Sequence, residues 1–127
     1  MGSPALYHQE NSYFSYLPPY GLVLWIALNK TTLKNGAVHF AKGSHRLEEI
    51  SHIRTGLPLF NKALPKPPDP SNHPEVSALL ERGDASIHHF LTVHQSGPKQ
   101  TKFNRHGFVL DYRARSAQIN QRDAETH

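Results

Sequence analysis

The sequence predicts an all-β protein, a sandwich or barrel of short strands, within a single domain. Seven or so segments rich in β-branched and aromatic residues are separated by turn signals such as Asn35-Gly36 and Gly83-Asp84. Six prolines between residues 58 and 74 exclude a long helix or a central strand there. The 127 residues are enough for one domain with one core, so we treat 1–127 as a single unit.

The N-terminal half contains three predicted strands. Residues 5–16 alternate loosely and contain four aromatic side chains, which predicts a strand that runs into a loop before Pro18-Pro19. Residues 21–28 form a continuous apolar run, short enough for a buried strand. Asn35-Gly36 is a strong hairpin signal, and a further strand is expected over residues 37–41.

Residues 45–75 form the least regular part of the chain. Residues 47–53 could form one or two helical turns, and the prolines that follow break regular structure. Connections of this length are usually functional lids or disordered segments, and an inert surface loop is equally compatible with this composition.

Strand signals return in the C-terminal half. Residues 76–80 predict a short strand, residues 85–93 a longer one with His88 and His89 in its middle, and residues 108–112 lie in the last strand. The polar tail, residues 114–127, is expected to be helical only if it docks and is otherwise frayed.

Composition excludes several functional classes. The net charge of +4 comes without a Lys/Arg run or stripe, so we expect no nucleic-acid partner. The chain has no cysteine, which excludes disulfides and zinc–thiolate sites. The longest apolar run, residues 21–28, is too short to span a bilayer, so we expect a soluble, cytoplasmic protein without a membrane partner.

Two separated stretches carry the candidate chemistry. His94 is expected near the end of one strand, and Arg105 lies eleven residues later, at the start of the next. Far upstream, His8 and Glu10 are two residues apart, which in a strand directs both side chains to one face. Two histidines and one carboxylate suit non-heme Fe(II), and a guanidinium can hold a carboxylate bidentately.

These stretches resemble the phytanoyl-CoA dioxygenase family of Fe(II)- and 2-oxoglutarate-dependent oxygenases. The resemblance covers about residues 7–113 and rests on landmarks that occur in the family's order. They are His8-Gln9-Glu10, Leu24-Trp25-Ile26-Ala27-Leu28, Asn35-Gly36, Gly43-Ser44-His45-Arg46, Gly83-Asp84, and His94-Gln95-Ser96-Gly97-Pro98 with Arg105.

The resemblance implies a double-stranded β-helix, the cupin or jelly-roll core, without the family's N-terminal helices and first strand. It implies that His8, Glu10 and His94 bind catalytic Fe(II), and that Arg105 grips the distal carboxylate of the co-substrate 2-oxoglutarate. Trp25 matches a tryptophan that lines the co-substrate pocket. The irregular residues 45–75 correspond to an insertion over the active-site mouth.

Each of these residues also has a structural interpretation. His8 and Glu10 could be exposed on a surface strand, Arg105 could be a surface arginine beside Lys99 and Lys102, and Trp25 could be a core residue. Mid-strand histidines are expected to fill the core or the space between strands. The histidines that compete with His94 for the metal are His45, His88, His89 and His106.

Two positions depart from the family's pattern. Glu10 stands where the family usually has aspartate, and the additional methylene shifts the metal position or the carboxylate's denticity. Lys99 stands where relatives often have asparagine. Glu10 also argues against the chemistry of related halogenases, which have a small residue in place of the carboxylate.

The function implied by the resemblance is hydroxylation of a small organic substrate by an Fe(II)- and 2-oxoglutarate-dependent dioxygenase. The main alternative is an inactive or incomplete jelly-roll module that binds a ligand or a partner, and a third is a zinc- or manganese-binding cupin. The short N-terminus is compatible with a fragment, a minimal member or a degenerate one. We expect an exposed sheet edge and apolar face where the family's first strand is missing, and therefore a symmetric homodimer joined near the N-terminal edge.

Overall fold

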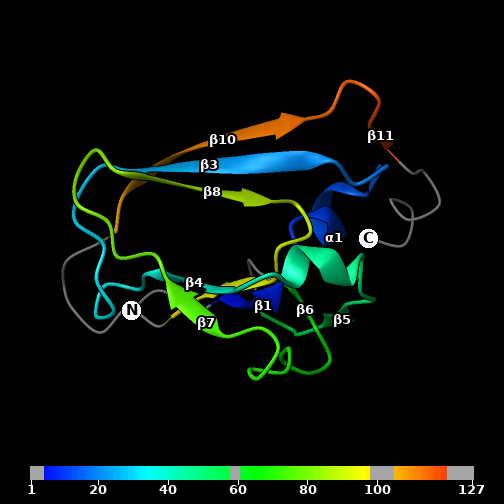
Figure 1. Cartoon of the computed structure of the whole chain (residues 1–127), viewed down its shortest axis with the longest axis horizontal. Coiled ribbons are helices and arrows are strands. Elements are labelled where there is room, and N and C mark those ends of the chain that lie inside the picture. Colours follow the sequence, from blue (N-terminus) through cyan, green and yellow to red (C-terminus); the bar gives the residue numbers. More distant parts are fainter. Residues whose placement is uncertain (1–4, 58–60, 98–104, 120–127) are drawn as a thin grey trace.

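Two antiparallel β-sheets face each other (Figure 1). Side chains from both sheets line a cavity that contains the candidate site residues. The structure, a computed structural model, describes residues 5–57, 61–97 and 105–119. The two-sheet architecture confirms the prediction of an all-β jelly roll.

The lower sheet in Figure 1 contains four strands, and every neighbouring pair is antiparallel. Its members come from four separate parts of the sequence, so the sheet depends on long-range pairing. In spatial order they are β1 (Ala5–His8), β9 (His94–Ser96), β4 (Val38–Ala41) and β7 (Glu75–Ser77).

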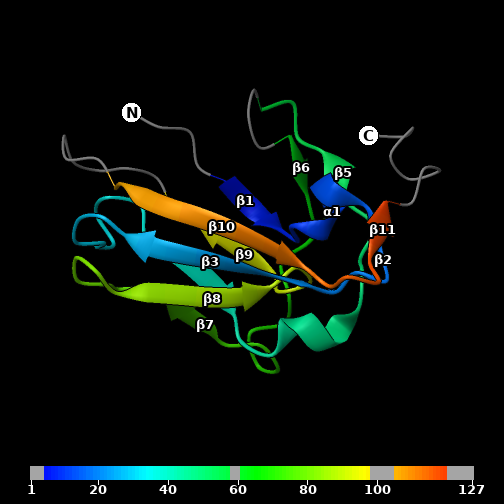
Figure 2. The ribbon, with the colours of Figure 1, turned by 90° about the horizontal axis from the view of Figure 1, so that it is seen from above.

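The upper sheet contains three strands that lie side by side in the view from above (Figure 2). Trp25 is paired with Val109 on one side and with Ser86 on the other, and all three side chains line the space between the sheets. Alternation therefore turns the intervening residues outward. The spatial order is β10 (Gly107–Arg113), β3 (Gly21–Ala27) and β8 (Ala85–His89).

The run over residues 21–28 forms β3 as predicted, but it is not buried on both faces. Val23 and Ala27 are buried, whereas Leu22 and Leu28 are exposed. The reason is that one face of the upper sheet packs inward and the other is open among the described residues. Continuous apolar sequence alone does not distinguish these two situations.

The predicted hairpin at Asn35-Gly36 is wrong. A turn is present and Gly36 has a positive φ of 90°, but the strands before and after it lie in different sheets. β3 pairs with β10 and β8, whereas β4 pairs with β9 and β7. The turn therefore carries the chain across the gap between sheets, because both strands find better partners far away in sequence.

The strand predicted over residues 85–93 is shorter in the structure. β8 ends at His89, and a turn follows in which the Thr92 amide donates to the His89 carbonyl at 2.9 Å. Phe90, which is 1% exposed, anchors this turn through its amide to the Gly21 carbonyl. His94 consequently begins β9 instead of ending the preceding strand.

Short helical segments differ from the sequence prediction in position. The stretch predicted as strand and loop contains one helical turn, α1 (Asn11–Phe14), directly after β1. The helical turn expected over residues 47–53 lies earlier, as the 3-10 helix η1 (Ser44–Leu47), and β5 (Ile53–Arg54) follows. Gly43, the N-cap residue of η1, has a positive φ of 77°.

The described parts of the irregular segment, residues 45–57 and 61–75, contribute two short strands and part of the packing. β5 pairs with β6 (Lys62–Ala63), and Leu64 then packs with Ala41 and Val93 on the outer side of the lower sheet. Most of this segment is therefore a structural cover for that sheet, while η1 stays near the gap between the sheets.

The start of the C-terminal tail is a strand. β11 (Gln118–Ile119) pairs with β2 (Tyr16–Leu17), and Ala117 beside it is only 2% exposed. The expectation of a helical or frayed tail is wrong for residues 114–119, because a two-residue partner upstream recruits them. Residues 120–127 lie outside the described part of the chain. None of the helices in the described part is long and apolar enough to cross a membrane.

Candidate metal centre

His8, Glu10 and His94 converge at one end of the space between the sheets. β1 ends at His8 and β9 begins at His94, and these two residues are direct cross-strand partners. Glu10 Oε1 lies 3.6 Å from His8 Nε2 and 2.8 Å from His94 Nε2. The three candidate ligand atoms all lie within 4.8 Å of one another.

The local reason for this convergence differs from the one that the sequence suggested. Glu10 does not continue the strand, because its backbone is right-handed helical (φ −58°, ψ −37°) and begins α1. Its carbonyl accepts from the amides of Tyr13 and Phe14. A strand end followed at once by a helical turn therefore aims His8 and Glu10 at the same point.

Backbone carbonyls orient both histidines in the same way. His8 Nδ1 lies 2.6 Å from the carbonyl oxygen of Leu6, and His94 Nδ1 lies 2.9 Å from that of Thr92. A carbonyl only accepts, so in each neutral ring Nδ1 donates the proton and Nε2 presents its lone pair. Such second contacts are typical of histidines that bind metals.

The resulting donor set fits a divalent metal ion. Two imidazole nitrogens and a carboxylate oxygen face one another, and the 2.8 Å between His94 Nε2 and Glu10 Oε1 requires a proton or a metal ion between these two acceptors. Burial acts to raise the pKa of Glu10, but hydrogen bonds and charge from His8 and His94 outweigh burial and hold this pKa well below its usual range. The carboxylate is therefore ionised and available as a ligand.

A cavity of about 190 Å³ extends from these residues between the sheets. Arg105 and Trp25 line it with the triad, and the Arg105 guanidinium carbon lies 5.0 Å from the centre of a Trp25 ring. Burial lowers the pKa of Arg105, and its guanidinium forms no ion pair with any described residue. The structure thus brings together all five residues that the sequence singled out.

Gly107 is a residue of the site that the sequence analysis missed. A Cβ atom at this position would collide with the indole of Trp25. The absence of a side chain lets the indole lie flat against β10, beside Arg105. The sequence contains a pattern that could have identified Gly107. It lies two residues after Arg105, and residues at this spacing share one face of an extended chain.

His88 also lines the cavity, beside His94, although the sequence indicated a filler. Its ring centre lies 4.5 Å from that of His94 and 5.1 Å from that of Phe40. Neither ring nitrogen has a hydrogen-bond partner among the described residues. Burial, followed by the neighbouring His94, lowers the pKa of His88 to about 3, so this ring is neutral.

The other competing histidines lie away from the triad. His89 points to the opposite side of β8 from His88 and its ring centre is 6.2 Å from that of His45. His45 and His106 are exposed. Among the described residues, the triad of His8, Glu10 and His94 is the group whose atoms meet at metal-binding distances.

Gln9, between the two upstream ligands, connects the metal motif to other parts of the fold by hydrogen bonds. Its side chain is fully buried, at 0% exposure. Its Nε2 donates to the carbonyl oxygens of Glu48 (2.7 Å) and Leu91 (3.0 Å), and its Oε1 accepts from the amide of Ile50 (2.9 Å). One side chain therefore ties β1 to the segment after η1 and to the turn before β9.

We expect Gln9→Leu to lower the free energy of unfolding by about 2–5 kcal/mol, because it removes a buried side chain's hydrogen bonds to three backbone groups, of which the Leu91 carbonyl is buried and the other two are partly buried. Chemical denaturation followed by circular dichroism measures this change. Gln118→Leu, at an exposed position of β11, is the matched control and should change stability by less than about 0.5 kcal/mol. Equal losses in the two variants would contradict the connecting role of Gln9.

The family model described as phytanoyl-CoA dioxygenase (PhyH) matches residues 1–107. The chain belongs to the phytanoyl-CoA dioxygenase family. The match includes His8, Glu10, His94 and Arg105, which the fold brings around one cavity. The resemblance inferred from the ordered motifs is thus confirmed.

Relatives and solved structures agree with this assignment. A probable alpha-ketoglutarate-dependent hypophosphite dioxygenase of Stutzerimonas stutzeri is 29% identical over 119 residues, 91% of this chain and 42% of that protein. EvdO2 from Micromonospora carbonacea var. aurantiaca, complexed with 2-oxoglutarate, has a TM-score of 0.76 and 26% identity over 93% of this chain and 48% of its own.

A third similar structure is the epimerase SnoN in complex with Fe3+, alpha ketoglutarate and nogalamycin RO. Its TM-score is 0.72 at 27% identity, and the match covers 91% of this chain and 44% of SnoN. The chain spans less than half the length of the curated relatives that it matches.

Proposed function

We propose that this chain carries the catalytic core of an Fe(II)- and 2-oxoglutarate-dependent dioxygenase that hydroxylates a small organic substrate. The observation that supports it most directly is the arrangement of His8, Glu10 and His94 at one end of a cavity that also contains the half-buried Arg105, which has no ion-pair partner among the described residues. A dicarboxylate such as 2-oxoglutarate, which chelates iron, needs a metal site and a carboxylate-binding group in the same cavity.

In this proposal His8, Glu10 and His94 would hold Fe(II) at the end of the cavity. When bound, the iron supplies the redox chemistry that couples O2 and 2-oxoglutarate to substrate hydroxylation, with succinate and CO2 as the other products. Arg105 binds the distal carboxylate of 2-oxoglutarate in a bidentate, charge-assisted pair. Trp25 holds the guanidinium in place, and the apolar side chains of Phe40 and Val109 exclude water.

Anaerobic titration of Fe(II) in the presence of 2-oxoglutarate tests this function. A weak visible charge-transfer band that saturates at one iron per chain is the expected result. Absence of the band, with iron still bound, would favour a metal-binding cupin without oxygen chemistry. Absence of both would favour an inactive module that binds a ligand or a partner.

We also propose that two copies of the chain associate through the upper sheet. Its outer face is apolar, and its exposed members include Leu22 (44% exposed), Ile87 (65%), Phe108 and Tyr112. Within the described residues β10 has a neighbouring strand on one side only. A second copy fits this surface because the outward residues of the three strands include no Lys, Arg, Asp or Glu. The chain has a net charge of +4, so two copies repel least where their contact surfaces carry no charged side chains.

Sedimentation at micromolar concentration is expected to show twice the 14.3 kDa mass of the chain. Tyr112→Lys should shift the equilibrium to monomer, because it places a charge on the self-associating face. Leu79→Lys changes a leucine that is 59% exposed outside this face, and it should leave the dimer intact. A wild-type monomer would refute this proposal without affecting the metal centre.

A further inference from the structure

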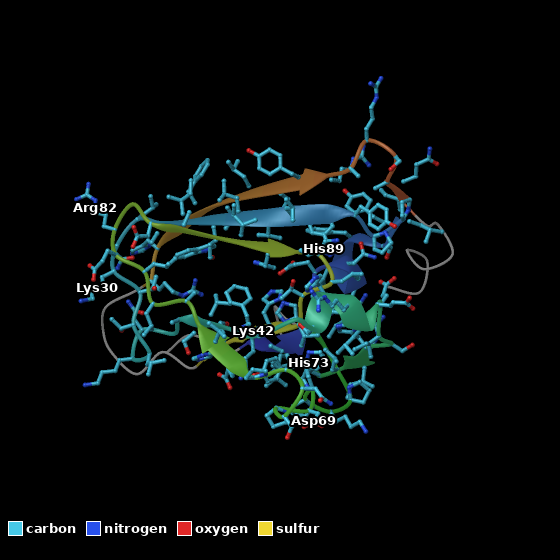
Figure 3. All side chains as sticks on the ribbon, in the orientation of Figure 1. Lys30, Lys42, Asp69, His73, Arg82 and His89 are labelled. Carbon is cyan, nitrogen blue, oxygen red and sulfur yellow. The ribbon has the colours of Figure 1, made fainter. Side chains whose placement is uncertain are left out.

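A second cavity, of about 350 Å³, lies where β4 and β8 end, and we refer to it as the outer cavity. Its walls are residues 40–43 with His45 on the lower layer, and residues 87–89 with Thr92 on the upper one. In Figure 3, His89 lies at the end of β8 and Lys42 lies in the layer below it. Phe40 and His88 line this cavity and the metal cavity, so the two cavities meet at this aromatic pair.

The outer cavity is lined by potential cations and lacks acidic residues. Lys42, His45 and His89 are among its nine lining residues, and none of the nine is Asp or Glu. The nearby Glu75 instead lies 3.0 Å from Nδ1 of His39, whose side chain alternates with that of Phe40 and so leaves the opposite face of β4. The Lys42 ammonium forms no hydrogen bond or ion pair with a described residue.

A hydrogen bond within the turn determines which nitrogen of the His89 ring can donate to a ligand. Its Nδ1 accepts from the Leu91 amide at 3.0 Å, so the proton of the neutral ring is on Nε2. Burial, and then the charge of His45, lower the pKa of His89, because two imidazolium groups at this separation repel each other. An anion between the rings would remove that repulsion. The hydroxyl group of Thr92 adds a further donor to the same lining.

We propose that the outer cavity binds an oxyanion, a phosphate or a carboxylate group. Its ligands are Lys42, His45 and His89. The group belongs to the primary substrate, whose reacting end reaches the metal cavity beside the Phe40–His88 pair, because the two ring centres are 5.1 Å apart and leave no passage between them. The anion site stands on its own residues, whereas the assignment of the anion to the substrate rests on the proposed function.

Calorimetric titration of inorganic phosphate, and separately of acetate, into the metal-free chain tests the site. We expect one phosphate per chain. Lys42→Gln and His89→Gln should each weaken its binding roughly tenfold, as expected for loss of one charge-assisted or desolvated contact. The acetate titration shows whether a carboxylate serves equally or whether the third oxygen and the second charge of phosphate are required.

Two control variants distinguish binding in the outer cavity from diffuse attraction to surface charge and from binding at Arg105. Lys66→Gln removes the same charge from an exposed position outside both cavities, and it should bind phosphate as the wild type does. Arg105→Gln should also bind it unchanged. Failure of both anions to bind, an equal loss in Lys66→Gln, or a loss confined to Arg105→Gln would overturn the proposal. Phosphate binding without the Fe(II)–2-oxoglutarate band would refute only the proposed function.

Discussion

His94→Ala is expected to abolish stoichiometric iron binding. The substitution removes one of three donors and the imidazole nitrogen that lies 2.8 Å from Glu10 Oε1. Removal of contacts that merely orient a ligand typically costs about 10–100-fold in metal affinity, so we expect loss of the ligand itself to exceed this range. Iron content after anaerobic reconstitution and desalting measures the effect.

His88→Ala is the matched control, because it removes a buried imidazole whose ring centre is 4.5 Å from that of His94. This variant should retain one iron per chain, since the His88 nitrogens lie outside the group of converging ligand atoms. Iron retained by His94→Ala but lost by His88→Ala would show that the ligand assignment is wrong.

Arg105→Ala is expected to weaken 2-oxoglutarate binding by roughly tenfold or far more while iron binding is retained. Loss of one partner from a desolvated, charge-assisted pair costs about 2–5 kcal/mol. The effect should be large here because the guanidinium is half-buried and has no carboxylate partner among the described residues. The dissociation constant follows from the intensity of the visible chelate band at fixed iron.

Arg113→Ala is the control for this change. Arg113 lies at the end of β10 and its guanidinium carbon is 5.3 Å from the centre of the Tyr16 ring, so it also stacks on an aromatic side chain. It does not line the metal cavity, and its removal should leave the affinity for 2-oxoglutarate unchanged. An unchanged dissociation constant in Arg105→Ala would exclude Arg105 as the anchor.

The sequence by itself determined the fold class, the approximate position of the main strands and the identity of the candidate site residues. These properties depend on short-range patterns. A continuous apolar run such as residues 21–28 predicts a strand wherever it pairs, and His-x-Glu restricts two candidate ligands to one short stretch. The ordered motifs then pointed to His94 and Arg105 in preference to other histidines and arginines.

Only the tertiary structure determined which strands are neighbours. Asn35-Gly36 has the local properties of a hairpin turn, yet it connects two sheets, because β3 is held by β8 and β10 and β4 by β7 and β9. Likewise, β2 recruits residues 118–119, which have no strand pattern of their own. The free energy that stabilises each strand comes from pairing with strands that are distant in sequence. A local sequence pattern therefore cannot predict which strands become neighbours.

Tertiary structure also determined which histidine faces which cavity. The turn between His89 and His94 ends one strand and starts another in the opposite sheet, so His94 reaches Glu10 while His88 lies against His94 from across the gap. His89, one residue further on, faces the outer cavity instead. Side-chain direction in a strand reverses at every residue, so the face that each histidine occupies depends on the residue at which the strand ends. The buried Phe90, whose amide donates to the Gly21 carbonyl, fixes the end of β8 at His89.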